Sequence, residues 1–500
     1  MTALGIDLGT TYSAMAIVED AQQSHARIVP NTAGETTTPS AVYFDAERPI
    51  VGTQARLAAT VAPADCIELV KRHMGDASWR FETSAGTSYS AAQISALILR
   101  RLALDAEAAL NESIRQAVIT VPAYFDDARR RATAQAGVIA GLDVLRVLNE
   151  PTAAALAFGY RTAPGPEQTV LVYDLGGGTF DVTVVRIDGD DFRVLATAGD
   201  RNLGGFDFDN VLMLHVDEQL QKLGDESSLD GEHAEAVLRD RCEQAKRALS
   251  TLPEVSVKIG EHGIPISRGL FTELSAPLLR STEEITQEVL GEADIEAGYL
   301  DSVLLVGGST RMPMVAAMLE RITGTRVDRS VHPDEAVALG AAICADQIVA
   351  GHLPQRRRRP TIFDVTAHSL GVVARSGNTG AEINTVVIAR NTPIPAQGRR
   401  RFHTLAENQR EILVVVTEGE DEDPAYVTIV GSARIRVPPH GHDEMVVEVI
   451  LGYTADGMIE VSVLDAQRQR ELGEFVIDRQ AAIDKDELDK MRAALHTLDI

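Results

Sequence analysis

The sequence has few cysteines and no segment that would direct it to or through a membrane. Its 500 residues include three cysteines, Cys66, Cys242 and Cys344, which lie far apart and form no metal-ligand spacing. An odd and sparse count argues against a disulfide framework and fits a reducing compartment. The N-terminus does not resemble a signal peptide, and no apolar run reaches the roughly 18 residues of a membrane-spanning helix. These absences predict a cytoplasmic protein with no membrane partner.

Basic residues are also in short supply. Lys and Arg total 47 against 73 Asp and Glu, so the formal net charge is −26. A chain with this charge repels nucleic acid and anionic membrane surfaces, and we expect neither as a main partner. The acidic residues are spread along the chain and form no tail, which favours a role in solubility.

The pattern of the sequence changes at about residue 350. Before it, β-branched runs alternate with helical patterns, which predicts a mixed α/β fold. Examples of the runs are residues 117–121, 170–173 and 302–306. Residues 337–349 predict a largely buried helix, and a Pro- and Arg-bearing break follows it.

Beyond the break the sequence shows strand-like runs. These are residues 411–416, 426–430, 445–450 and 458–463, with a hairpin signal at Asp456-Gly457. Four or more strands at this spacing indicate a sandwich, and one amphipathic helix follows from about Ala481 to Leu498. We therefore expect an α/β domain over residues 1–354, a linker over 355–364, a β-sandwich over 365–478 and a short helix within 479–500.

A near-repeat marks a candidate site. Residues 6–12 (IDLGTTY) and 173–181 (YDLGGGTFD) each place an aspartate, Asp7 or Asp174, before a Gly/Thr turn. Such a turn aims backbone N–H groups at an anion, and the aspartate is placed to hold a hydrated Mg²⁺. One such turn could equally be an ordinary hairpin, whereas two favour a phosphate site. No GxxxxGK[ST] run is present, so this is not a P-loop.

Longer motifs carry a family resemblance. They are residues 5–13 (GIDLGTTYS), 119–125 (ITVPAYF), 148–159 (LNEPTAAALAFG), 174–182 (DLGGGTFDV), 304–313 (LLVGGSTRMP) and 333–342 (PDEAVALGAA). Together they resemble the nucleotide-binding domain of Hsp70 chaperones, and the run at 72–79 is similar to the bacterial HscC-like branch. The resemblance implies an α/β actin-like (duplicated RNase H-like) ATPase domain followed by an all-β sandwich domain. It also implies hydrolysis of ATP to ADP and phosphate, with Mg²⁺ and K⁺.

The resemblance implies roles in hydrolysis for particular residues. Lys71 matches the lysine that reaches the γ-phosphate and the attacking water, and Glu150 matches the carboxylate near that water. The acids that order Mg²⁺ and K⁺ are matched by Asp7, Asp174 and Asp181. The phosphate-contacting threonines are matched by Thr11 and Thr179. Phosphoryl transfer needs charge neutralisation and an aligned water more than covalent chemistry, so these residue types suit the reaction.

The resemblance also implies a set of nucleotide contacts. They are Gly9, Thr10, Thr11, Tyr12, Gly176, Gly177, Gly178, Gly204, Gly205, Glu243, Lys246, Arg247, Ser250, Gly307, Gly308, Ser309, Arg311 and Asp334. The four members from 243 to 250 share one helix face by spacing, which by itself is more typical of a solvated charged face. With the resemblance they match a clamp on base and ribose, in which Arg247 and Arg311 are available to stack on adenine.

Further matches concern peptide binding and communication. By resemblance, Val372, Phe402 and Ile412 line a pocket for one apolar side chain of an extended peptide, and Arg375 and Leu405 arch over it. The alternative is that the apolar members are ordinary sandwich core. The residues matching relay positions between domains are Pro122, Arg130, Arg146 and Asp364. The implied partners are unfolded or extended peptides, a J-domain co-chaperone and a nucleotide-exchange factor.

The sequence departs from the family pattern in three places. Arg375 stands where the family has methionine, and this arginine favours binding of acidic peptides. The linker keeps only two large apolar residues, so less apolar area is available for docking it onto the nucleotide-binding domain. The run Arg356–Arg359 precedes them, and it is either a solvated loop or a contact to an acidic surface. One helix after the sandwich predicts truncation before the helical lid. Two alternatives stay open: a lidless regulatory relative holding one dedicated partner, and a small-molecule kinase on the actin-like fold.

Overall fold

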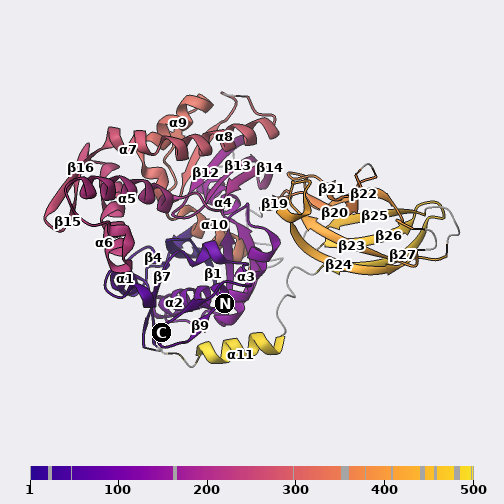
Figure 1. Cartoon of the computed structure of the whole chain (residues 1–500), viewed down its shortest axis with the longest axis horizontal. Coiled ribbons are helices and arrows are strands. Elements are labelled where there is room, and N and C mark those ends of the chain that lie inside the picture. Colours follow the sequence, from indigo (N-terminus) through magenta and orange to yellow (C-terminus); the bar gives the residue numbers. More distant parts are fainter. Residues whose placement is uncertain are drawn as a thin grey trace. The chain divides into compact units, whose positions relative to one another are not determined.

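Figure 1 shows the computed structural model, which describes residues 2–20, 25–46, 48–161, 166–296, 298–350, 360–377, 379–406, 409–439, 445–454, 459–477, 485–496 and 498. The chain divides into two compact units. The first comprises residues 1–124, 132–362 and 483–500, and the second comprises residues 125–131 and 363–482. The division at residue 362 falls within the predicted linker. The Arg356–Arg359 run and the Asp456-Gly457 signal lie outside the described residues.

The first unit contains two sheets with the same strand order. In the first sheet β11, β10 and β1 are parallel, and β2 and β3 continue antiparallel from β1. Its strands are β1 (Ala3–Asp7), β2 (Tyr12–Asp20), β3 (His25–Ile28), β10 (Gln116–Val121) and β11 (Asp143–Asn149), with β4 (Thr38–Pro39) paired to β2.

The second sheet repeats this plan. Strands β18, β17 and β12 are parallel, β13 and β14 are antiparallel, and β19 lies beside β14. Its strands are β12 (Gln168–Leu175), β13 (Phe180–Asp188), β14 (Asp191–Asp200), β17 (Ser302–Val306), β18 (Val327–Asp328) and β19 (Thr361–Phe363). The repeat places Asp7 on β1 and Asp174 on β12 at corresponding strand ends.

Two helices join these sheets. Helix α10 (Ala336–Ala350) packs on β1, β2 and β10, helix α4 (Glu150–Arg161) packs on β12, β13 and β14, and the helices pack on each other. Glycines permit the close approach: a Cβ on Gly5 would lie 2.0 Å from the Ala342 nitrogen, and a Cβ on Gly340 would lie 1.7 Å from the Ala153 oxygen. Backbone-to-backbone packing therefore sets the separation of the two strand ends.

The remaining elements of the first unit surround this centre (Figure 1). The other helices that lie wholly in the first unit are α1 (Thr53–Ala58), α2 (Ala91–Leu110), α5 (Gly205–Lys222), α6 (Glu232–Leu249), α7 (Arg268–Leu274), α8 (Ala276–Glu292), α9 (Pro313–Thr323) and α11 (Lys485–His496). Helix α3 (Asp127–Ile139) begins within residues 125–131. The short strands are β5 (Val42–Asp45), β6 (Arg48–Val51), β7 (Cys66–Ile67), β8 (Phe81–Glu82), β9 (Ser88–Tyr89), β15 (Glu254–Ile259) and β16 (His262–Ser267).

The second unit is built from two antiparallel four-stranded sheets. One has the order β21-β20-β23-β24, with β20 (Leu370–Arg375), β21 (Glu382–Ile388), β23 (Glu411–Glu418) and β24 (Thr428–Arg436). The other has the order β22-β25-β26-β27, with β22 (Ala396–His403), β25 (Val446–Tyr453), β26 (Ile459–Asp465) and β27 (Arg470–Ile477). Buried residues of both sheets form one apolar core, because strand alternation turns every second side chain inward.

The predicted change from mixed α/β to all-β is observed along the chain. The helix predicted over residues 337–349 corresponds to α10, and the four strand-like runs correspond to β23, β24, β25 and β26. In the described part of the chain, no helix combines the length and the apolar character that a bilayer crossing requires.

Candidate functional site

Acidic side chains gather at the ends of β1 and β12. Asp7 is the last residue of β1, and Thr120 Oγ1 donates a hydrogen bond to it over 3.3 Å. Asp174 is paired in register with Asp181 across β12 and β13. Asp181 is buried and accepts a hydrogen bond from the Tyr124 amide over 3.0 Å. The structure thus supplies carboxylates from both sheets.

These carboxylates repel one another in a poorly hydrated setting. Burial, followed by the charge of Glu150, raises the pKa of Asp7 to about 7. Burial and the charges of Glu150, Asp181 and Asp7 raise the pKa of Asp174 well above its usual value. A cation near them would relieve this cost. Among the described residues no group of three or more His, Cys, Asp or Glu is arranged to bind a metal directly. Carboxylates can also hold a Mg²⁺ ion through the waters that it retains.

One buried cation lies beside these acids. Lys71 belongs to the 3₁₀ turn Val70–His73, only 4% of its surface is exposed, and its Nζ lies 2.5 Å from Glu150 Oε1. Glu150 is the first residue of α4, where the helix dipole favours a negative charge. Because a buried charge without a partner is costly, the pair is held in one geometry. Lys71 also lowers the pKa values of Asp7 and Asp174, although burial outweighs it.

The two Gly/Thr turns lie against each other. A Cβ on Gly177 would fall 1.7 Å from Thr11 Oγ1, and a Cβ on Gly178 would fall 2.3 Å from Thr10 Cγ2. Any larger residue at either glycine would push the turns apart. The two turns, which the sequence predicts to face one ligand, are therefore in contact in the structure.

Hydrogen bonds orient the second turn. The Gly176 carbonyl accepts from the Gly205 amide (2.9 Å) and from Ser309 Oγ (2.8 Å), and the Gly177 carbonyl accepts from the Phe206 amide (2.8 Å). The amides of Gly177 and Gly178 have no hydrogen-bond partner within the part of the chain that the structure describes. Carbonyls that are satisfied by protein leave these N–H groups for an anionic ligand.

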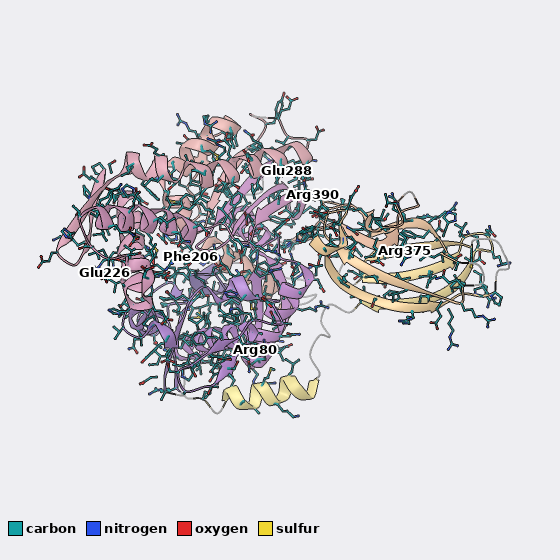
Figure 2. The ribbon with its side chains drawn as sticks, in the orientation of Figure 1. Arg80, Phe206, Glu226, Glu288, Arg375 and Arg390 are labelled. Atoms are coloured by element: carbon teal, nitrogen blue, oxygen red, sulfur yellow. The ribbon has the colours of Figure 1, made fainter. Side chains whose placement is uncertain are left out.

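Arg72 reinforces this arrangement. Its Nε donates to the Gly178 carbonyl over 3.0 Å, and its guanidinium forms an ion pair with Asp207 at 2.5 Å. Asp207 also accepts from the Gly204 amide over 2.8 Å at the start of α5. The guanidinium lies 5.0 Å from the centre of the Phe206 ring, which Figure 2 labels. One arginine therefore fixes both the turn and the first residues of α5.

A cluster around Tyr12 connects the two halves of the first unit. Arg247 of α6 donates to the Tyr12 hydroxyl over 2.8 Å and pairs with Glu243 at 3.3 Å. Arg56 of α1 donates to the same hydroxyl and forms an ion pair with Glu243. Both guanidinium carbons lie 5.1 Å from the centre of the Tyr12 ring. Arg56, a residue that no motif indicated, therefore contacts Tyr12 and Glu243, two of the residues predicted to contact the nucleotide.

Lys246 lies on the same helix but contacts α5 and not Tyr12. Its Nζ donates to the Gly205 carbonyl and to Asp209 Oδ2, both over 2.8 Å. Burial raises the pKa of Asp209 to about 6, although Lys246 opposes that shift. Burial, with the charge of Asp209, also raises the pKa of the Cys242 thiol to about 12, which keeps it in the weakly reactive protonated form. Ser250 directly follows α6 and is half-buried.

The third loop lies at the end of β17. Arg311 and Asp334 form an ion pair at 2.6 Å, and Arg311 is about half exposed. Gly307 has a φ of 82° and would place a Cβ 2.4 Å from the Leu175 carbonyl, so only glycine fits there. Asp334 lies near Gly308, because a Cβ on that glycine would be 3.4 Å from Asp334 Oδ1. The loop therefore approaches the end of β12 closely.

The residues matched to domain communication occupy varied places. Pro122 follows β10 and is buried, and Arg146 lies on β11. Arg130 Nε donates to the Phe125 carbonyl over 3.0 Å. The carbonyl of Asp364 accepts from the Ile394 amide over 3.0 Å. The relay role of these four residues stays a prediction.

In the second unit the predicted peptide residues divide into two groups. Val372 is buried, and Phe402 and Ile412 are partly buried against the same core. Arg375 and Leu405 are exposed, Leu405 to 64%. Val372 pairs with Val416 and therefore lies about four residue steps, roughly 13 Å, along β23 from Ile412. Val372 thus behaves as core, and Ile412 lies nearer the exposed pair.

Sequence reasoning missed several residues that lie around the two turns and the Tyr12 cluster. Arg56 meets Glu243 across 187 positions, and Arg72 meets Asp207 across 135. Asp209 pairs with Lys246 across 37 positions. The sequence feature that could have indicated Asp207 and Asp209 is their position directly after Gly204-Gly205. No sequence feature indicated Arg56.

Facing Gly/Thr turns with unbonded amides, a buried lysine and buried acids are features of a site for a phosphate-bearing ligand and its cation. The comparison with known protein families identifies the group. The family described as Hsp70 protein matches residues 3–498. The chain therefore belongs to the Hsp70 family. Members of this family are ATP-binding chaperones that hydrolyse ATP with Mg²⁺, bind unfolded peptides and act with J-domain and exchange-factor partners.

Proposed function

We propose that this chain hydrolyses ATP at the meeting point of the two Gly/Thr turns and uses the nucleotide state to regulate binding of extended peptide by the β-sandwich unit. The observation that carries the proposal is the pair of turns in contact, with the free amides of Gly177 and Gly178 beside the Lys71–Glu150 pair. Unbonded amides and a buried ammonium are what a triphosphate requires.

We assign a separate role in ATP binding and hydrolysis to each group of the site. The Gly177 and Gly178 amides and the hydroxyls of Thr11 and Thr179 bind phosphate oxygens. Lys71 places positive charge at the terminal phosphate, and Glu150 orients both Lys71 and the attacking water. These contacts stabilise charge on the transferred group, which is the main demand of phosphoryl transfer.

The buried acids Asp7, Asp174 and Asp181 would hold hydrated Mg²⁺, and K⁺ is proposed beside it. A cation held by these acids would supply positive charge that offsets the charge of the phosphate oxygens. The raised pKa values of Asp7 and Asp174 support this assignment, because two acids that repel each other in a buried place are stabilised by a cation.

At the other end of the nucleotide, the Tyr12 cluster would clamp the nucleoside. Arg56 and Arg247 hold Tyr12 and Glu243 from α1 and α6, which belong to different halves of the first unit. A ligand under this cluster leaves only after the Arg56–Glu243 pair separates. We also propose a cytoplasmic setting, similarity to the HscC-like branch and stimulation by a J-domain partner.

The proposal is tested by hydrolysis of ATP by the full chain, with and without an extended apolar peptide. We expect Mg²⁺-dependent hydrolysis that peptide stimulates several-fold, and faster peptide dissociation in ATP than in ADP. A chain that binds no nucleotide in the presence of Mg²⁺ would refute the ATPase. Hydrolysis that peptide leaves unchanged, with equal peptide dissociation in ATP and ADP, would refute the coupling alone.

A further inference from the structure

A hollow of about 530 Å³ lies at one end of the second unit's β23–β24 pair. It is lined by Gln409, Arg410, Glu411, Arg436, Val437 and Pro439. The strand pairing ends here, because Glu411 pairs with Arg436 in register and the Val437 amide donates to the Arg410 carbonyl over 2.9 Å. The hollow is therefore framed by backbone of fixed geometry.

Hydrogen bonds connect the hollow to the predicted peptide groove. Gln409 Oε1 accepts from the amide of Leu405, the predicted arch residue, over 2.8 Å. Its Nε2 donates to the Glu411 carbonyl over 2.7 Å, and Ile412 is the next residue. A single side chain thus bridges the arch and the strand that carries the predicted apolar pocket. The hollow therefore begins one residue before Ile412 along the chain.

The hollow holds more positive charge than its own acid balances. Arg410 and Arg436 are exposed, and neither has an ion pair or hydrogen bond from its side chain to any described residue. Among the described lining residues Glu411 is the one acid, and its one ion contact within 4 Å is to Arg434 at 3.9 Å, a weak exposed contact. Two guanidinium groups are therefore available to a ligand.

Arg375 carries a third guanidinium that has no ion pair or hydrogen bond to any residue the structure describes. Arg375 ends β20 and is labelled in Figure 2; its register partner is Glu382, but no ion pair joins them. The sequence from 365 to 477 contains no lysine, so cations in this unit are guanidinium groups and histidines. Guanidinium binds carboxylate through two parallel hydrogen bonds, which an ammonium cannot do.

We propose that the hollow is a subsite for a glutamate or aspartate side chain of the bound peptide, so that the peptide class is apolar with an acidic flank. The apolar anchor lies on Ile412, and the carboxylate lies in the hollow at the end of β23, between Arg410 and Arg436. At the rise of an extended chain, the acidic residue is roughly two to four positions from the anchor.

This inference rests on the proposed peptide binding, and the test separates the two. Nine-residue peptides with a central leucine carry two Glu, two Gln or two Lys as flanking residues. All are N-acetylated and C-amidated, so that only side-chain carboxylates contribute. Binding to the full chain in excess ADP is measured by fluorescence anisotropy at low and high salt.

We expect the Glu peptide to bind about tenfold more tightly than the Gln peptide at low salt, because charge-assisted hydrogen bonds are strong, and the advantage to shrink at high salt. The double variant R410Q/R436Q should bind the Glu peptide no better than the Gln peptide, with Gln-peptide affinity unchanged. The matched control is R399Q, since Arg399 is exposed, unpaired among the described residues and on the opposite face of β22 from Phe402. This control should keep the full preference.

Equal binding of the Glu and Gln peptides by the unchanged chain would overturn the inference and leave peptide binding intact. A preference that survives in R410Q/R436Q, or that R399Q abolishes equally, would show general charge attraction and would also overturn it. Failure of all three peptides to bind would overturn the peptide-binding function together with the inference.

Discussion

The proposed nucleotide site and the proposed peptide region differ in how they hold charge. In the first unit Lys71, Glu150 and Asp174 are each under 8% exposed and come from separate elements of both halves. In the second unit Arg375, Arg410 and the 64%-exposed Leu405 lie at the surface. Buried charges require fixed partners, whereas surface charges tolerate having none. The first site should therefore be sensitive to single charge changes, whereas in the second a change of apolar contact should lower affinity at least as much as removal of surface charge.

The largest effect is expected at Lys71. Lys71→Ala should lower single-turnover ATP hydrolysis by about 100-fold or more, because the lysine acts mainly on charge that develops in the transition state. Nucleotide affinity, measured with a fluorescent analogue, should stay within a few-fold. Peptide affinity in ADP should not change.

The matched control is Lys222→Ala, since Lys222 pairs with Glu218 on an exposed helix surface. It should hydrolyse ATP at the unchanged rate. A Lys71→Ala rate within about threefold of the unchanged chain would contradict the role given to Lys71, because a transition-state contact contributes far more than that.

The second unit should respond in the opposite way. Ile412→Asp should weaken peptide binding by roughly tenfold or more, since it places a charge where an apolar side chain is proposed to bind. Basal hydrolysis without peptide should be unchanged. Leu413→Asp is the control, because Leu413 is 55% exposed and lies on the other face of β23. Equal losses of peptide affinity in both variants would remove the assignment of Ile412.

A smaller effect is expected where the two halves of the nucleotide site meet. Arg56→Ala should speed ADP dissociation several-fold, up to roughly tenfold, because it removes the cross-half pair with Glu243. Stopped-flow release of a fluorescent nucleotide measures it. Arg27→Ala, which breaks the exposed pair with Glu19, should leave the rate unchanged. Unchanged dissociation in Arg56→Ala would show that the cluster does not retain nucleotide.

The smallest effect concerns stability. The folded pKa of Asp174 is raised above its unfolded value, so its contribution to stability falls as pH rises from about 4 through the folded pKa. At pH 8, Asp174→Asn removes this cost and should raise the nucleotide-free melting temperature of the first unit by a few degrees, about 2–4 °C. The gain should shrink at pH 5.

The same variant should gain less stability from Mg²⁺-ATP than the unchanged chain does, because it has lost charge near the proposed cation. Thermal melts with and without Mg²⁺-ATP measure both effects. A lower nucleotide-free melting temperature at pH 8, or an undiminished Mg²⁺-ATP gain, would contradict the account of these carboxylates.

Much of the nucleotide unit was accessible from the sequence because its parts are local. A strand end, a Gly/Thr turn and a following strand lie within about ten residues, so the two turns around Asp7 and Asp174 were recognisable. The helix over α10 and the strands β10, β12 and β17 were indicated by apolar runs in the same way. Sandwich strands β20, β21, β22 and β27 were not named from the pattern, since half-exposed strands such as RRRFH carry weak alternation.

The sequence by itself determined which parts are present: two Gly/Thr turns, the aspartates that precede them, and an α/β unit followed by a β unit. Tertiary structure decided which groups meet. The contact of Gly177 with Thr11, the pairing of Lys71 with Glu150 and of Arg56 with Glu243, and the hollow lined by both Arg410 and Arg436 all join segments that lie apart in the sequence. The physical reason is that motifs report short-range backbone geometry, whereas burial and ion pairing depend on which surfaces the packing of α4 against α10 and of the two β-sheets brings together.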